Sequence, residues 1–163
     1  MRNNLVQTDN GLYQANGDVA PEEIISTAAN ILLDRLINGE ALCSADATKQ
    51  FLQMALADDD NEHFAAIFLN SQNQVIAFET LFNGTINQAS VHPRVVVKKI
   101  IEHNAGAVIL AHNHPSDCIV PSEADKLITR ILKEALDLID VRVLDHIIVG
   151  RGDTYSFAEA GLI

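Results

Sequence analysis

Two stretches in the N-terminal third of the chain place apolar residues at the spacing of a helix with one buried face. The first is expected over residues 21–37, because Pro21 is tolerated in the first turn of a helix. The second is expected over residues 45–57, with Ser44 as its N-cap. The polar residues 1–20 contain turn sequences, so they form either a small hairpin or a loose arm.

After an acidic run, the pattern changes to short apolar segments typical of buried strands. The segment AVILA is wholly apolar, as expected of a strand that is buried on both faces. The expected strands cover residues 64–69, 75–82, 107–111, 143–149 and 154–157, and the later helices cover residues 93–104 and 122–138. The chain shows no repeat or linker, which predicts one mixed α/β domain with helices packed on a sheet. Residues 1–44 are expected to form an arm and a helix that pack on the main domain, residues 45–163.

The composition narrows the function classes. The chain has 163 residues, of which 48% are hydrophobic, and this is enough for one sizeable core. Eleven basic and 22 acidic residues give a net charge of −11, which counts against direct nucleic-acid binding. No apolar run reaches the ~18 residues that suggest a membrane span, and the N-terminus lacks a signal-peptide core. Two cysteines, Cys43 and Cys118, cannot form a disulfide framework, so we expect a reduced, cytoplasmic protein.

The most informative segment is AHNHPSDCIVPSEAD at residues 111–125. His112 and His114 lie two residues apart where an apolar strand ends, so an extended backbone points both imidazoles to one side. Asp125 follows in the first turn of the next expected helix. Two nitrogens and one carboxylate form the ligand set of a catalytic zinc site with a fourth position for water. Zinc would lower the pKa of that water toward ~7.

A structural interpretation of the same segment stands beside this one. Ser122 and Asp125 have the spacing of a capping box, with Asp in place of Glu, so both could serve to start a helix. The loop between the histidines and the helix, residues 112–121, contains ordinary turn formers, which are Asn113, Pro115, Ser116 and Pro121. The two interpretations are compatible, because one serine can cap the helix and also face a metal-bound water.

These residues resemble a known family. The spacing of His112, His114, Ser122 and Asp125 matches the motif of the JAMM (MPN-plus) metalloproteases. The surrounding chain is similar to the RadC-type branch in six segments: EHFAAIFLN at 62–70, the Gly84-Thr85 pair, VHPR at 91–94, AHNHPS at 111–116, PSEAD at 121–125 and LDHIIVG at 144–150. The resemblance runs from about residue 45 to the C-terminus. It implies a JAMM/MPN fold, in which helices flank a layered mixed sheet similar to the cytidine-deaminase architecture.

The resemblance also implies roles for single residues. His112, His114 and Asp125 would hold zinc, and Ser122 would bind the metal water or steady the developing oxyanion. The family has a glutamate at the head of its first core strand as the general base, and Glu62 stands at that place. Glu79, a lone carboxylate in the apolar segment VIAFETLF, is the alternative base, because a hairpin would bring it to the same end of the sheet. Glu62 is preferred because the Glu-x-Phe start of its strand matches the family.

Other positions bear on the same site. Asp117 stands where the family usually has glycine, and Asp tolerates a positive φ better than most residues if the loop requires one. Cys118 is interpreted as a small loop residue rather than a metal ligand. Asp145 and His146 either orient a ligand or bond only to structural neighbours, and the structural interpretation is preferred. The longer relatives carry an N-terminal helix-hairpin-helix, and the first 44 residues here show none, which removes the main reason to expect DNA binding.

The sequence therefore predicts a zinc metallopeptidase or isopeptidase. Zinc-bound water would attack an amide carbonyl with glutamate as general base, and the expected substrate is a protein or peptide. The alternative is a non-catalytic binding module linked to DNA repair or mobile-element biology, with zinc absent or structural. A deaminase is disfavoured, because the chain lacks the Cys-x-x-Cys half of the deaminase motif.

Overall fold

A computed structural model describes residues 4–39, 44–57, 59–84 and 91–163 of the chain. The helices of these ranges are α1 (Pro21–Ile37), α2 (Ala45–Leu56), α3 (Pro93–Glu102) and α4 (Glu123–Asp137). The strands are β1 (Leu5–Gln7), β2 (Tyr13–Ala15), β3 (His63–Leu69), β4 (Val75–Asn83), β5 (Ala107–Asn113), β6 (Arg142–Val149) and β7 (Thr154–Ser156). The mixed α/β class predicted from the sequence is confirmed. None of the helices in these ranges is long and apolar enough to cross a membrane.

The main sheet has the strand order β4-β3-β5-β6-β7. All neighbouring pairs are antiparallel except β5 and β6, which are parallel. A parallel pair needs a crossover connection, and α4 supplies it between the end of β5 and the start of β6. The start of α4 therefore lies near the C-terminal end of β5, which is the end that carries the histidine pair.

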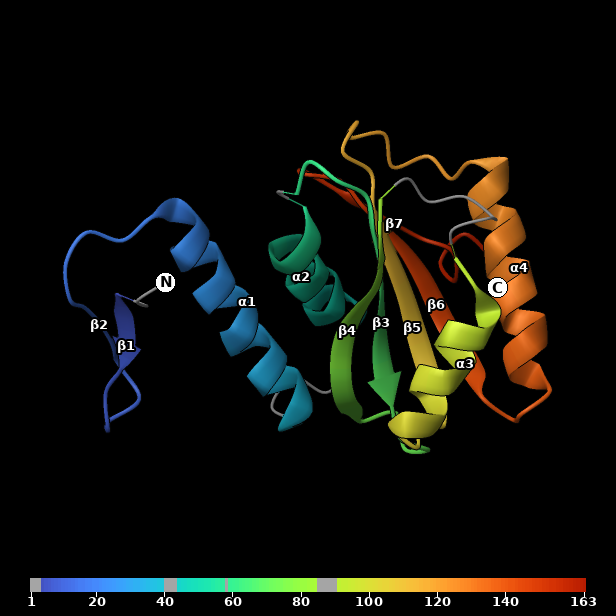
Figure 1. The fold of residues 1–163 in the computed structure, drawn as a ribbon, viewed down its shortest axis with the longest axis horizontal. Coiled ribbons are helices and arrows are strands. Elements are labelled where there is room, and N and C mark those ends of the chain that lie inside the picture. The colour runs from blue at the N-terminus through green and yellow to red at the C-terminus, as the bar shows by residue number, and fades with distance from the viewer. Residues whose placement is uncertain (1–3, 40–43, 58, 85–90) are drawn as a thin grey trace.

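Helices cover both faces of this sheet, with α1 and α2 on one side and α3 and α4 on the other (Figure 1). Strand β3, an inner strand of this sheet, has an apolar sequence because both of its faces are covered. Ala65, Ile67 and Leu69 pack in the core under α1 and α2, whereas Phe64 and Phe68 pack in the core under α3 and α4. Successive side chains of a strand point to opposite faces, so a strand covered on both faces needs apolar residues at every position.

The predicted helices and strands are confirmed, with small changes at their ends. Strand β5 continues through His112 and Asn113, two residues beyond the expected end, because both side chains stay buried. Ser44 caps α2 as expected, since its Oγ accepts a hydrogen bond from the Ala47 N–H at 3.1 Å. Cys43 lies outside the described residues.

The N-terminal segment forms a hairpin rather than a loose arm. Strands β1 and β2 pair antiparallel, with Leu5 opposite Ala15. The hairpin is attached to α1, because the Glu23 carboxylate accepts hydrogen bonds from the backbone N–H groups of Asn4 and Leu5. Helix α1 in turn packs against α2 and the edge strand β4.

The loop between β5 and α4 is fastened to the turn between β6 and β7. Asp117 has a φ of 64°, so this position does adopt the left-handed conformation that glycine favours. Its carboxylate accepts a hydrogen bond from the Arg151 N–H. Gly150 packs against the same carboxylate: a Cβ atom added there would lie 2.8 Å from the Asp117 Oδ1 and 2.9 Å from the Ile119 Cγ2. The aspartate thus makes a contact that a glycine could not make.

A Gly150→Ala substitution should loosen this fastening. The added methyl group must displace the Asp117 and Ile119 side chains, and we expect a loss of roughly 1–3 kcal/mol in the free energy of unfolding. Urea denaturation followed by circular dichroism measures the loss. Gly152→Ala is the matched control, because a Cβ atom at that position meets nothing within 4 Å. Equal stabilities of the two variants would contradict the proposed contact.

Candidate metal centre

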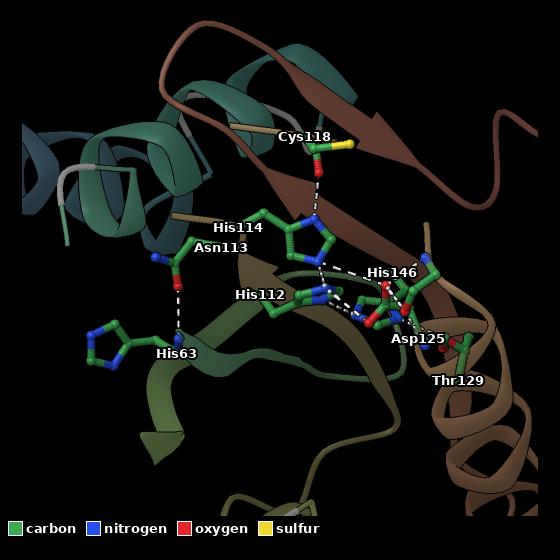
Figure 2. A network of polar contacts seen from close by, with 9 residues as sticks. His63, His112, Asn113, His114, Cys118, Asp125, Thr129 and His146 are labelled. Carbon is green, nitrogen blue, oxygen red and sulfur yellow. Dashed lines mark hydrogen bonds and ion pairs between the residues drawn. The ribbon is translucent and has the colours of Figure 1, made fainter. Parts of the chain in front are cut away.

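Three side chains from two elements converge at the C-terminal end of β5 (Figure 2). His112 is the penultimate residue of β5, His114 follows the strand, and Asp125 lies in the first turn of α4. The Nε2 atom of His112 lies 3.0 Å from the Nε2 atom of His114 and 3.3 Å from the Asp125 Oδ1. The His114 Nε2 is 3.7 Å from the Asp125 Oδ2. One ligand atom from each of the three residues lies within 4.8 Å of the other two.

The orientation of His114 is fixed by the loop that follows it. Its Nδ1 lies 2.5 Å from the backbone carbonyl oxygen of Cys118. A carbonyl oxygen only accepts hydrogen bonds, so the Nδ1 must carry the proton, and the neutral ring presents a lone pair at Nε2. Cys118 therefore contributes its carbonyl group, and its exposed thiol is not part of the metal cluster found among the described residues.

His112 is fully buried, and its Nδ1, the nitrogen turned away from the cluster, faces His146. Its Nδ1 lies 2.8 Å from the Nε2 of His146, whose Nδ1 in turn lies 2.6 Å from the Thr129 Oγ1. Complete burial lowers the pKa of His146 well below its usual value, so this ring is neutral at pH 7. His146 thus contacts both Thr129 and a residue of the cluster, so both interpretations of this histidine stay open.

Asp145, the sequence neighbour of His146, does not belong to this network. Its Oδ2 accepts a hydrogen bond from the Ser156 hydroxyl at 2.6 Å, and its Oδ1 accepts one from the Ala158 N–H at 2.9 Å. These contacts hold the chain after β7 against β6. The two neighbours thus have separate roles, Asp145 in the fold and His146 beside the cluster.

Asp125 and Ser122 form the predicted capping box at the start of α4. The Asp125 Oδ2 accepts hydrogen bonds from the Ser122 N–H at 2.7 Å and from its hydroxyl at 2.6 Å. Burial alone would raise the pKa of the Asp125 carboxyl group, but His112 and these hydrogen bonds outweigh burial and hold it far below its usual value. The carboxylate is therefore ionised at neutral pH. Its Oδ1 remains directed at His112.

The chemistry of this donor set fits a divalent metal ion. The Asp125 carboxylate is negative, and the His114 Nε2 presents a lone pair toward it and toward His112. Electron-pair donors this close repel one another unless a cation lies between them. Two imidazole nitrogens and one carboxylate are the protein ligands of catalytic zinc sites that keep an open position. The residues present therefore fit zinc.

Glu62 lies at the same end of the sheet. It directly precedes β3, in which Phe64 pairs with His112 of β5. Glu62 also lines a cavity of about 290 Å³ together with His114 and Asp125. The other residues that line this cavity are Ser116, Cys118, Val120 and Ser122. The Glu62 carboxylate thus shares one cavity with two of the three candidate metal ligands.

Asn113 has a role that sequence reasoning missed by treating it as a turn former. It is buried at the end of β5, and Figure 2 shows its amide pointing to His63, away from the histidine cluster. Its Oδ1 accepts a hydrogen bond from the His63 N–H at 2.7 Å, and its Nδ2 donates to the Asn61 carbonyl at 2.9 Å. These bonds hold the backbone on both sides of Glu62. The alternation of strand faces between His112 and His114 was the available signal.

Glu79 does not lie at the same end of the sheet as Glu62, which corrects that expectation. It pairs with Ala66 in the middle of the hairpin. Its carboxylate forms an ion pair with Lys99 of α3 at 2.9 Å and a hydrogen bond with the Nε2 of His103, the C-cap residue of α3, at 2.7 Å. The hydrogen bond from Lys99 is the main cause of a lowered pKa of Glu79. The structure therefore gives this carboxylate ion-pair partners far along the strand from the cavity.

Glu79→Gln should lower stability in a way that depends on pH. A pKa that is lower in the folded state stabilises the fold above the unfolded value near 4.5, and this contribution disappears as pH falls through the folded pKa. We expect a loss of less than about 1 kcal/mol at pH 7 that vanishes toward pH 3. Urea denaturation at both pH values measures it. The control is Glu134→Gln, on the exposed side of α4, and a loss independent of pH would contradict the assignment.

Comparison with known proteins gives the family. A family model described as the RadC-like JAB domain matches residues 42–162. The UPF0758 protein of Vibrio cholerae is 50% identical over 91% of this chain and 94% of its own length. The UPF0758 protein YeeS of Escherichia coli is 52% identical over 80% of this chain and 90% of its own length.

A third relative is longer. The UPF0758 protein Nmul_A2138 of Nitrosospira multiformis is 51% identical over 87% of this chain, and the match spans 63% of that relative. The chain thus corresponds to somewhat less than two thirds of the longer relatives. Since the family model covers most of its length and these relatives share about half of the aligned residues, the chain belongs to the RadC-like JAB domain family.

Proposed function

We propose that this protein is a zinc-dependent hydrolase of the JAMM metallopeptidase type that cleaves an amide or isopeptide bond in a protein or peptide. The observation that carries the proposal is the convergence of His112, His114 and Asp125 beside a cavity that His114, Asp125 and Glu62 line. A binding module has no need of a carboxylate beside an open three-ligand site. The protein substrate is suggested by the resemblance to JAMM enzymes.

The roles of the residues follow from their positions. His112, His114 and Asp125 would hold the zinc ion, which supplies Lewis acidity and an activated water molecule when it is bound. Glu62 would take the proton of that water and pass it to the leaving amine, as a carboxylate general base does.

Ser122 supports this arrangement through Asp125. In the structure its hydroxyl and its N–H both donate to the Asp125 Oδ2, so the serine holds the carboxylate in one orientation. Ser122 also lines the cavity, and its hydroxyl would donate to a developing oxyanion only after turning away from the Asp125 Oδ2. One residue would thus serve the helix, the ligand and the reaction.

Metal content tests the first part of the proposal. We expect about one zinc ion per chain in the purified protein, and its loss in a His112→Ala, His114→Ala double variant, because that variant removes two of three ligands. Inductively coupled plasma mass spectrometry measures the ratio. His103→Ala is the control, since this histidine pairs with Glu79 and not with the cluster. A wild-type protein without zinc after reconstitution at neutral pH would favour the binding module.

Glu62→Gln tests the second part. The variant should keep one zinc per chain but lose cleavage of an internally quenched peptide library by roughly 10²- to 10⁴-fold, because the amide cannot accept the proton of water. Glu79→Gln should cleave at the wild-type rate. An active Glu62→Gln variant, or an inactive Glu79→Gln variant, would contradict the assignment of the base. Zinc-loaded wild-type protein that cleaves no member of the library would contradict the peptidase function.

A further inference from the structure

We infer that Thr129 and His146 are positioning residues, which form a directed hydrogen-bond chain that decides which nitrogen of His112 carries its proton. The chain runs from the backbone of Asp125 through Thr129 and His146 to His112 (Figure 2). The effect on metal binding rests on the proposed function. The positions of the protons along the chain do not depend on a bound metal.

The direction of the chain is set at its first bond. The Thr129 Oγ1 lies 2.6 Å from the backbone carbonyl oxygen of Asp125, one helical turn earlier in α4. A carbonyl oxygen can only accept, so the single hydroxyl proton of Thr129 points to it. The Thr129 oxygen can then only accept from its second partner, the Nδ1 of His146, at 2.6 Å.

The remaining two steps follow from the chemistry of imidazole. A neutral imidazole has one N–H and one lone pair. Because the Nδ1 of His146 donates to Thr129, its Nε2 is the acceptor, and the His112 Nδ1 at 2.8 Å must supply the proton of that bond. When the His112 ring is neutral, its Nε2 is left with a lone pair, and this is the atom that faces His114 and Asp125.

An irregularity in β6 makes this contact possible. Val108 pairs with Val143, but the next residue of β5, Ile109, pairs with Asp145, so Leu144 is an extra residue in β6. Such a bulge changes which side chains face which side of the sheet. It brings His146 to the face of α4, where Thr129 lies.

The ring of His146 is also held by packing. It stacks on Phe157 with ring centroids 4.9 Å apart and meets the edge of Phe64 at 5.5 Å. The side chain is fully buried, so no water competes for its nitrogens. A ring held in this way accepts the hydrogen bond of His112 in one orientation. Through its two nitrogens it links His112 of β5 to Thr129 of α4.

The first test measures the tautomers directly in metal-free wild-type protein. Two-bond ¹H–¹⁵N correlation spectra at neutral pH distinguish a protonated from an unprotonated ring nitrogen. We expect both His112 and His146 to carry their proton on Nδ1. A His112 ring without a proton on Nδ1, or a His146 ring with a proton on Nε2, would overturn the inference.

The second test compares two substitutions of Thr129. Thr129→Val keeps the branched shape but removes the hydroxyl, so the Nδ1 of His146 loses its acceptor. Either nitrogen of His146, and therefore either nitrogen of His112, can then carry the proton. We expect a mixture of His112 tautomers and a zinc dissociation constant roughly 10-fold higher, at the lower end of the effect of groups that orient a metal ligand. Thr129→Ser keeps the hydroxyl and should keep both properties. Competition with a chromophoric chelator measures the zinc affinity.

The outcomes separate this inference from the proposed function. A purely structural role for Thr129 would lower the urea midpoint of Thr129→Val without moving the ring nitrogen signals, and this result would overturn the inference. Wild-type tautomers and zinc affinity in Thr129→Val would overturn it as well. A wild-type protein that shows the expected tautomers but binds no zinc would contradict the proposed function and leave the hydrogen-bond order established.

Discussion

The parallel pairing of β5 with β6 is the constraint on which the candidate site depends. It forces the chain to leave the end of β5, cross one face of the sheet as α4 and return to the start of β6. The first turn of α4 must then lie beside the end of β5. His112 and Asp125 meet for this reason, although they belong to different elements. Sites outside the carboxyl ends of strands are common in sheets built this way.

The second requirement is that an ionised carboxylate can stay inside the protein. Asp125 is 3% exposed, and burying a charge is costly unless it is paired and hydrogen-bonded. The capping box from Ser122 supplies part of the compensation, and the histidines with a bound cation would supply the rest. The same two residues therefore start the helix and prepare a ligand. This explains why the structural interpretation of the segment and the proposed metal site are compatible in geometry.

Local patterns made most of the fold and the three converging side chains predictable. His112, His114, Ser122 and Asp125 lie within fourteen residues, so spacing alone indicates that they can meet. The sequence left two interpretations of His146 open, because its contact with His112 spans 34 residues and depends on a bulge that no periodicity reveals. The position of Glu79 was predictable by counting: it lies four residues after β4 begins at Val75 and four before it ends, in the middle of the hairpin, whereas Glu62 lies at the far end of the hairpin.

The ligand side chains differ in how they are oriented, and this difference links the site to the whole fold. His114 is oriented by a carbonyl four residues away, and Asp125 by a serine three residues away, so both are fixed by contacts within one segment. His112 is oriented by His146, a residue of another strand. The segment can therefore form two thirds of the donor set by local hydrogen bonds. The third donor acquires its orientation only when β6 and its bulge are in place, which makes a complete set a property of the folded sheet.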